Sequence, residues 1–110
     1  MPRVAPEQAP EVDLDEMQRA LEAGDVVVDV REQEEYERAH VPGVRLIPLS
    51  QLEQRWEEIP SEGRIYVVCQ AGARSLTAAT ALRQAGLDAV SVAGGTGKWQ
   101  EEGRPIETGA

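Results

Sequence analysis

The sequence predicts a single small α/β domain in which a central parallel sheet carries helices on both faces. Short runs of β-branched residues alternate with helix-compatible segments along the 110-residue chain, which is typical of parallel strands joined by helical crossovers. The expected strands 26–30 and 65–68 are apolar on both faces, as strands are when helices cover both sides of a sheet. A chain of this length fits one domain and can bury roughly 60 to 70% of the surface that its unfolded form exposes.

The chain begins with a segment that we expect to be flexible, followed by a helix and a strand. Residues 1–11 are Pro-rich and polar, a composition typical of an extended leader. Asp13 or Asp15 can cap a helix that ends at Gly24. The β-branched run 26–30 then predicts the first strand.

A polar segment and a tight turn follow this strand. Residues 32–38 are compatible with a short helix whose inward anchor is Tyr36. Pro42 and Gly43 are adjacent, which is a strong signal for a type II turn. The only histidine, His40, precedes this turn. We expect it to be a structural hydrogen-bonding residue rather than a catalytic base, because the sequence contains no recoverable Cys–His signature.

Strands and helices alternate from here to the C-terminus. Helices are indicated by N-capping residues and by glycine or proline stops, and strands by β-branched runs. The expected elements are strand 44–47, a helix capped by Ser50 and ended by Pro60, strand 65–68, helix 75–85 ended by Gly86, strand 89–93, a short helix containing Trp99 and ended by Gly103 and Pro105, and a tail over 107–110.

The only cysteine, Cys69, lies between strand 65–68 and a turn that contains Gly72 and leads into an Ala-rich helix, for which Ser75 is the expected N-cap. Such a turn directs backbone N–H groups inward, and the helix N-terminus adds partial positive charge. This setting lowers a thiol pKa from about 8.5 into the range of roughly 3.5 to 7.5. The resulting thiolate would attack electrophilic sulfur. The alternative is that Cys69 is an inert, buried hydrophobic residue, as lone cysteines after apolar strands usually are.

Composition excludes several classes of protein. With 20 acidic and 11 basic residues the net charge is −9, which disfavours binding to nucleic acids and to anionic membranes. A single cysteine allows neither an intrachain disulfide nor a CxxC metal or redox pair, and a free thiol suits the reducing cytoplasm. No apolar run has the length of a membrane span, and the N-terminus lacks the apolar core of a signal peptide.

The glycine-rich stretch 94–98 is not a Walker phosphate loop. That motif requires a glycine five residues before Gly97, and Val92 occupies this position. We expect the double glycine, Gly94 and Gly95, to allow close approach of two backbone segments. The sequence therefore predicts neither a metal nor a cofactor.

Four motifs in this order and spacing resemble the rhodanese-like domain family, from about Asp25 to Pro105. They are Val28-Asp29-Val30-Arg31-Glu32 with Glu35-Tyr36; His40-Val41-Pro42-Gly43 followed by Ile47-Pro48; Cys69-Gln70-Ala71-Gly72-Ala73-Arg74-Ser75; and Gly94-Gly95 with Trp99 and Gly103-Arg104-Pro105. The resemblance implies a domain over 12–106 with a central parallel sheet of about five strands.

The resemblance also implies a sulfurtransferase. Its cysteine, matched by Cys69, would accept sulfane sulfur from thiosulfate or another donor as a persulfide and pass it to cyanide or a thiol. The residues matching the active-site loop are Gln70, Ala71, Gly72, Ala73, Arg74 and Ser75. Asp29 and Arg31 match the family's paired charges beside that loop, and we expect Asp29 to hold Arg74. Three positions of the loop are uncharged, namely Gln70, Ala71 and Ala73. We therefore do not expect tight binding of dianionic thiosulfate.

Two other functions remain open. One is a persulfide-carrying or signalling module that docks a protein partner and turns over small donors slowly. The other is a phosphatase or arsenate reductase, as in relatives with a longer loop. The second is disfavoured, because four residues separate Cys69 from Arg74 where the phosphatase relatives have five, and the ring of amides must match the oxyanion held.

Overall fold

The computed structural model describes residues 8–110 and contains a five-stranded, fully parallel sheet of order β1-β5-β4-β2-β3. The single α/β domain predicted from the sequence is confirmed. The strands are β1 (Glu11–Val12), β2 (Val26–Asp29), β3 (Arg45–Leu46), β4 (Arg64–Val68) and β5 (Asp88–Val92). The helices are α1 (Leu14–Glu22), α2 (Gln33–Arg38), α3 (Leu52–Arg55), α4 (Ala73–Gln84) and α5 (Gly95–Glu101).

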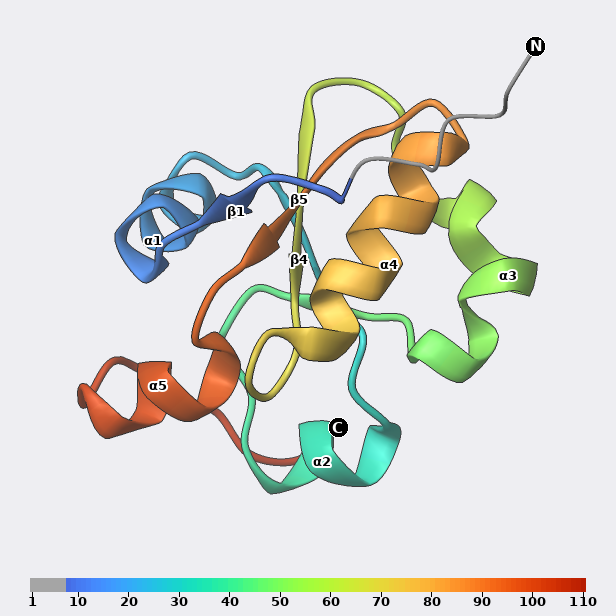
Figure 1. Cartoon of the computed structure of the whole chain (residues 1–110). Helices are drawn as coiled ribbons and strands as arrows, with labels where there is room; N and C mark the ends of the chain where they lie inside the picture. The colour runs from blue at the N-terminus through green and yellow to red at the C-terminus, as the bar shows by residue number, and fades with distance from the viewer. Residues whose placement is uncertain (1–7) are drawn as a thin grey trace, which may run out of the picture.

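Helices cover both faces of the sheet, so the structure has two hydrophobic cores. One core lies under α3 and α4 and the other under α1 and α5 (Figure 1). Strand β4 contributes to both: Ile65 and Val67 pack into the first core, whereas Tyr66 and Val68 pack into the second. This explains why the strand reads as a continuous apolar run rather than an alternating one.

The edge strand β1 was missed by the sequence prediction, which placed residues 8–11 in a flexible leader. Ala9 is buried, and its N–H donates to the Thr80 hydroxyl at 3.0 Å. The Ser91 N–H donates to the Pro10 carbonyl at 2.9 Å, and Glu11 lies in β1. The chain from Ala9 onward therefore belongs to the folded domain, while positions 1–7 of the predicted leader lie outside the described residues. A strand of two residues is too short to show the period-two pattern that identifies strands.

Helix boundaries show which capping predictions were right. Asp13 caps α1, because its carboxylate accepts from the Glu16 N–H at 2.8 Å. Ser50 is not an N-cap: it lies in a 3₁₀ turn, Leu49–Gln51, and its hydroxyl donates to the Glu32 carboxylate at 3.2 Å. The single helix predicted there is a series of short turns, in which a second 3₁₀ turn, Trp56–Glu58, follows α3.

Two predictions outside the sheet are confirmed. His40 is a structural residue: it is buried, its ring stacks on Tyr36 at 3.7 Å, and its Nδ1 lies 2.8 Å from the Tyr36 carbonyl. Its backbone also pairs with Glu107, so the predicted tail begins at a residue held against the domain. The helix containing Trp99 is α5, and the indole N–H donates to the Pro105 carbonyl at 2.6 Å.

Candidate active site

Cys69 follows β4 at the carboxyl edge of the sheet, where open α/β sheets place their ligands. Its side chain is only 1% exposed. The Gly72 N–H donates to the sulfur at 3.0 Å, and the Ser75 hydroxyl oxygen lies 3.4 Å from it. The same hydroxyl donates to the Gly72 carbonyl at 3.1 Å and lies 2.8 Å from the hydroxyl of Ser91. The sulfur is thus held among polar groups, whereas the rest of Cys69 packs in the core under α4.

The loop gives the thiol an environment that favours the thiolate. Burial raises the pKa of Cys69, but hydrogen bonding between the sulfur and the Ser75 side chain, and with the N–H groups of Ser75, Gly72 and Ala71, outweighs burial, so the pKa lies below that of an ordinary thiol. An anion here is stabilised by donors that are already in place, at the N-terminus of a helix of 12 residues.

Alkylation kinetics test this environment. We expect the rate of Cys69 alkylation by iodoacetamide, followed against pH, to have its midpoint below the value of about 8.5 that describes a free thiol. At neutral pH the rate should therefore be a larger fraction of its maximum than the rate of a model thiol is. Denatured protein is the matched control, because unfolding removes the loop and should return the midpoint to the ordinary value. A midpoint at or above 8.5 in the folded protein would contradict the activated thiol.

The helix that follows the loop begins earlier than predicted. Its N-cap is Gly72, with φ of 115°, and α4 starts at Ala73, so Ser75 lies inside the first turn and is not the N-cap. The left-handed backbone at Gly72 turns its N–H toward the sulfur, a conformation that a side chain would disfavour. The Ser75 hydroxyl donates to the Gly72 carbonyl, and its oxygen lies 3.4 Å from the Cys69 sulfur.

The backbone at the double glycine, Gly94 and Gly95, packs against the cysteine loop. Gly95 has φ of 61°, and a Cβ there would lie 2.6 Å from the Gln70 carbonyl oxygen. The next N–H groups donate to the loop, from Thr96 to the Cys69 carbonyl at 2.8 Å and from Gly97 to the Gln70 carbonyl at 3.0 Å. The close backbone approach predicted for this stretch is confirmed, and it anchors the residues on either side of the sulfur.

Asp29 and Arg31 form a buried ion pair beside the loop. Asp29 lies next to Val68 in the sheet, and neither charged side chain is more than 2% exposed. The Arg31 guanidinium donates to both Asp29 oxygens, at 2.9 to 3.1 Å. It also donates to the Ala39 carbonyl at 2.8 Å and to the Gln70 side-chain oxygen at 3.2 Å. Arg31 therefore links β2, α2 and the cysteine loop.

The prediction that Asp29 holds Arg74 is wrong. Arg74 pairs with Glu35 of α2 through two parallel hydrogen bonds of 2.7 and 2.8 Å. The physical reason is that Arg31 already occupies both oxygens of Asp29, which leaves no acceptor for a second guanidinium. Glu35 belongs to the first of the four motifs, but no role was predicted for it, because pattern alone does not distinguish it from the other glutamates of the same polar helix.

The structure brings together most of the residues predicted for the site. Around the sulfur lie the N–H groups of Ala71 and Gly72 and the hydroxyl of Ser75. Ala73 is exposed at the start of α4 and makes no side-chain contribution that the structure records. Ser91 was missed; the available signal was a serine in the middle of the predicted strand 89–93, which is otherwise apolar, and the structure buries it fully.

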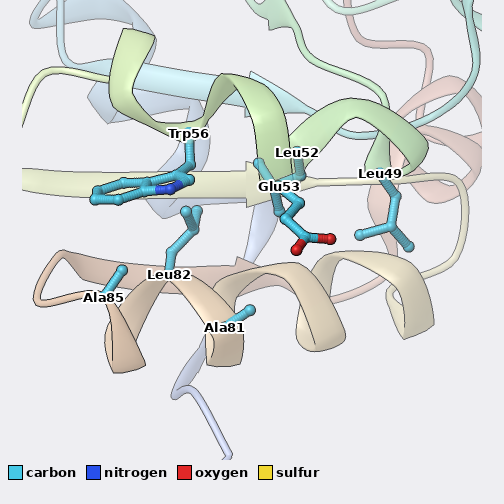
Figure 2. Close-up of a pocket in the computed structure, with 7 residues that line it drawn as sticks. All are labelled: Leu49, Leu52, Glu53, Trp56, Ala81, Leu82 and Ala85. Carbon is cyan, nitrogen blue, oxygen red and sulfur yellow. The ribbon is translucent and has the colours of Figure 1, made fainter.

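The surface has a cleft beside the cysteine loop and a separate groove between two helices. A polar cleft of about 350 Å³ adjoins the loop and is lined by Arg31, Glu35, Arg38, Ala39, Gln70 and Gln100. An apolar groove of similar size runs between α3 and α4 and is lined by Leu49, Leu52, Glu53, Trp56, Ala81, Leu82 and Ala85 (Figure 2). The cleft reaches Gln70, the residue next to Cys69, whereas none of the residues that line the groove belongs to the cysteine loop.

Within residues 8–110, no set of three or more His, Cys, Asp and Glu side chains gathers in a way that could hold a metal ion. Across the same described residues, no helix has the length and apolar character needed to cross a membrane.

Comparison with known proteins connects this geometry to a family. The model of the rhodanese-like domain matches residues 13–102. A putative sulfur carrier protein of Bacillus subtilis (strain 168), YrkF, is 39% identical over 83 residues, covering 74% of this chain and 45% of that protein. Thiosulfate sulfurtransferase 18 of Arabidopsis thaliana is 32% identical over 117 residues, covering 93% of this chain and 86% of that protein.

A solved structure agrees with the fold. The crystal structure of a rhodanese-related protein from Thermoplasma volcanium superposes with a TM-score of 0.82 at 31% identity, covering 89% of this chain and 97% of that one. Some relatives are longer: the chain spans 45% of YrkF and 59% of a second Bacillus subtilis protein, YqhL.

Proposed function

The chain belongs to the rhodanese-like domain family, and on this premise we propose that it is a sulfurtransferase that moves sulfane sulfur through a persulfide on Cys69. The observation that carries the proposal is the position of the sulfur, 3.0 Å from the Gly72 N–H and within reach of the Ser75 hydroxyl. These donors would stabilise the thiolate before transfer and the persulfide anion after it. Gln70 to Ser75 form the binding loop, and Asp29 with Arg31 supports it.

The reaction has two steps. The Cys69 thiolate attacks the outer sulfur of the donor, the donor S–S bond breaks, and the leaving group departs with the electron pair, as sulfite when the donor is thiosulfate. The acceptor, cyanide or a thiolate, then attacks the terminal sulfur of the persulfide, and the Cys69 thiolate is regenerated. The covalent intermediate predicts ping-pong kinetics. Electrons balance without any oxidant or reductant.

Relatives support this class of reaction without fixing the donor or acceptor. One relative bears the name thiosulfate sulfurtransferase and another that of a putative sulfur carrier, so thiosulfate and persulfides are the proposed donors, and cyanide or a thiol the proposed acceptor. A free thiol suits the cytoplasm, where we propose that the protein acts. The likeness to a putative carrier also favours a second function, in which the Cys69 persulfide is delivered to a protein partner with little turnover of small donors.

Intact-mass spectrometry tests the persulfide. After incubation with thiosulfate, the protein should gain about 32 Da, and dithiothreitol should remove the added mass. Reversal by the thiol is essential, because a sulfinic acid adds the same nominal mass but resists reduction. The matched control is the Cys69→Ser variant, which should gain nothing. If the parent protein gains no reducible mass from thiosulfate or from a low-molecular-weight persulfide, Cys69 does not carry sulfur and the proposed function is wrong.

A further inference from the structure

The guanidinium groups of Arg31, beside the cysteine loop, and of Arg74, within it, are paired with carboxylates of this chain. The Arg31 guanidinium donates to the Asp29 carboxylate, to the Ala39 carbonyl and to the Gln70 side-chain oxygen. Arg74 donates from both terminal nitrogens to the two oxygens of Glu35. Arginine uses the same pair of parallel hydrogen bonds to donate to two oxygens of a phosphate or another oxyanion. Glu35 therefore occupies the position on Arg74 that an anionic substrate would otherwise take.

Glu35 keeps its charge at working pH. The hydrogen bonds from Arg74 outweigh the effect of burial and lower the pKa of Glu35 to about 2. Glu35 also lines the polar cleft that adjoins the loop, together with Gln70 and the exposed Arg38. Arg74 lies close enough to the sulfur that the charge of Cys69, in addition to the stronger effect of Glu35, raises the pKa of Arg74. A donor entering the cleft thus meets the carboxylate that is paired with Arg74.

We propose that Glu35 is a specificity-determining residue, whose carboxylate keeps dianionic donors off Arg74 and favours donors with a single negative charge or none near the sulfane sulfur. The proposal rests on the proposed function and names the donor class that the site prefers. A unit charge a few ångströms from a partly exposed site changes the binding of a dianion by at least about tenfold. Within the loop, Gln70, Ala71 and Ala73 are uncharged, so the loop adds no cation to Arg74; the exposed Arg38 lies on the α2 side of the cleft.

Two donors that differ by one charge test the proposal. Thiosulfate carries two negative charges and methanethiosulfonate carries one; in both, Cys69 attacks the outer sulfur, and sulfite or methanesulfinate leaves with the electron pair. Glu35→Gln should lower KM for thiosulfate by about tenfold and change KM for methanethiosulfonate by less than about threefold. The matched control is Glu34→Gln, which removes the same charge from an exposed neighbour on α2 and should move neither KM.

A double variant shows whether the lower KM for thiosulfate depends on Arg74. If the freed Arg74 binds the donor, the double variant Glu35→Gln with Arg74→Gln should lose the improvement in thiosulfate KM. If Glu35→Gln instead lowers kcat for both donors by the same factor and leaves the ratio of their kcat/KM values unchanged, Glu35 only braces the loop and the specificity role is overturned.

Protection by sulfate separates this inference from the proposed function, because it needs no sulfur transfer. Sulfate is an unreactive dianion, and its binding should slow alkylation of Cys69 by iodoacetamide. We expect half-maximal protection of Glu35→Gln at about a tenfold lower sulfate concentration than for the parent. If that shift occurs while neither donor reacts, the proposed function is wrong and the role of Glu35 stands. If both proteins require the same sulfate concentration, the role of Glu35 is overturned, whatever sulfur transfer shows.

Discussion

Cys69→Ser is expected to reduce sulfur transfer from thiosulfate to cyanide by at least about a thousandfold while leaving the domain folded. A serine hydroxyl is not ionised near neutral pH, even among donors that stabilise an anion, and it cannot form a persulfide. The smaller oxygen fits the site, because it can accept from the Gly72 N–H and bond to Ser75 as the sulfur does. Loss of activity would therefore reflect chemistry rather than unfolding.

The measurement is thiocyanate formation, with circular dichroism and urea unfolding to verify the fold. Thr77→Ala is the matched control: it lies on the exposed side of α4, its hydroxyl bonds only to the Ala73 carbonyl, and its activity should stay near that of the parent. Activity of Cys69→Ser within a few-fold of the parent would mean that the sulfur chemistry resides elsewhere or in a contaminant.

The parts of the fold that the sequence could predict are those where local and tertiary preferences agree. Strand β4 is β-branched and buried on both faces, and glycine marks the turn after it, so strand, loop and helix were all expected in the right order. β1 could not be found, because two residues carry no periodicity and only pairing with β5 makes them a strand. Ser75 is a good capping residue by type, but the left-handed Gly72 caps the helix three residues before the predicted N-cap.

The ionic partners in the site were less predictable than the elements that hold them. Several acidic residues lie near Arg31 in the sequence, whereas none lies within ten residues of Arg74, so its partner had to come from a distant segment. The choice depends on geometry: Asp29 ends a strand and faces Arg31, whereas Glu35 projects from α2 toward the cysteine loop. Burial then decides the strength of each pair, which a sequence does not reveal.

Arg31→Met is expected to lower the free energy of unfolding by about 3 to 5 kcal/mol, the largest stability effect that we anticipate outside the cores. Asp29 is fully buried, and its side-chain hydrogen bonds all come from Arg31: one from the backbone N–H at 3.0 Å and the others from the guanidinium. Methionine fills a similar volume but leaves an unpaired carboxylate away from water. It also removes the donor to the Ala39 carbonyl and the anchor of the Gln70 side chain.

Urea unfolding of three variants separates the buried charge from lost packing. Arg38→Met, on the exposed surface of α2, should change the free energy of unfolding by no more than about 0.5 kcal/mol. Asp29→Asn combined with Arg31→Met should be more stable than Arg31→Met alone, because the amide carries no charge and can still accept from the backbone N–H of residue 31. If the double variant is no more stable than Arg31→Met, the unpaired charge is not what destabilises the single variant. Arg31 would then act through packing and its bonds to α2 and the loop, and the ion pair would be incidental to the fold.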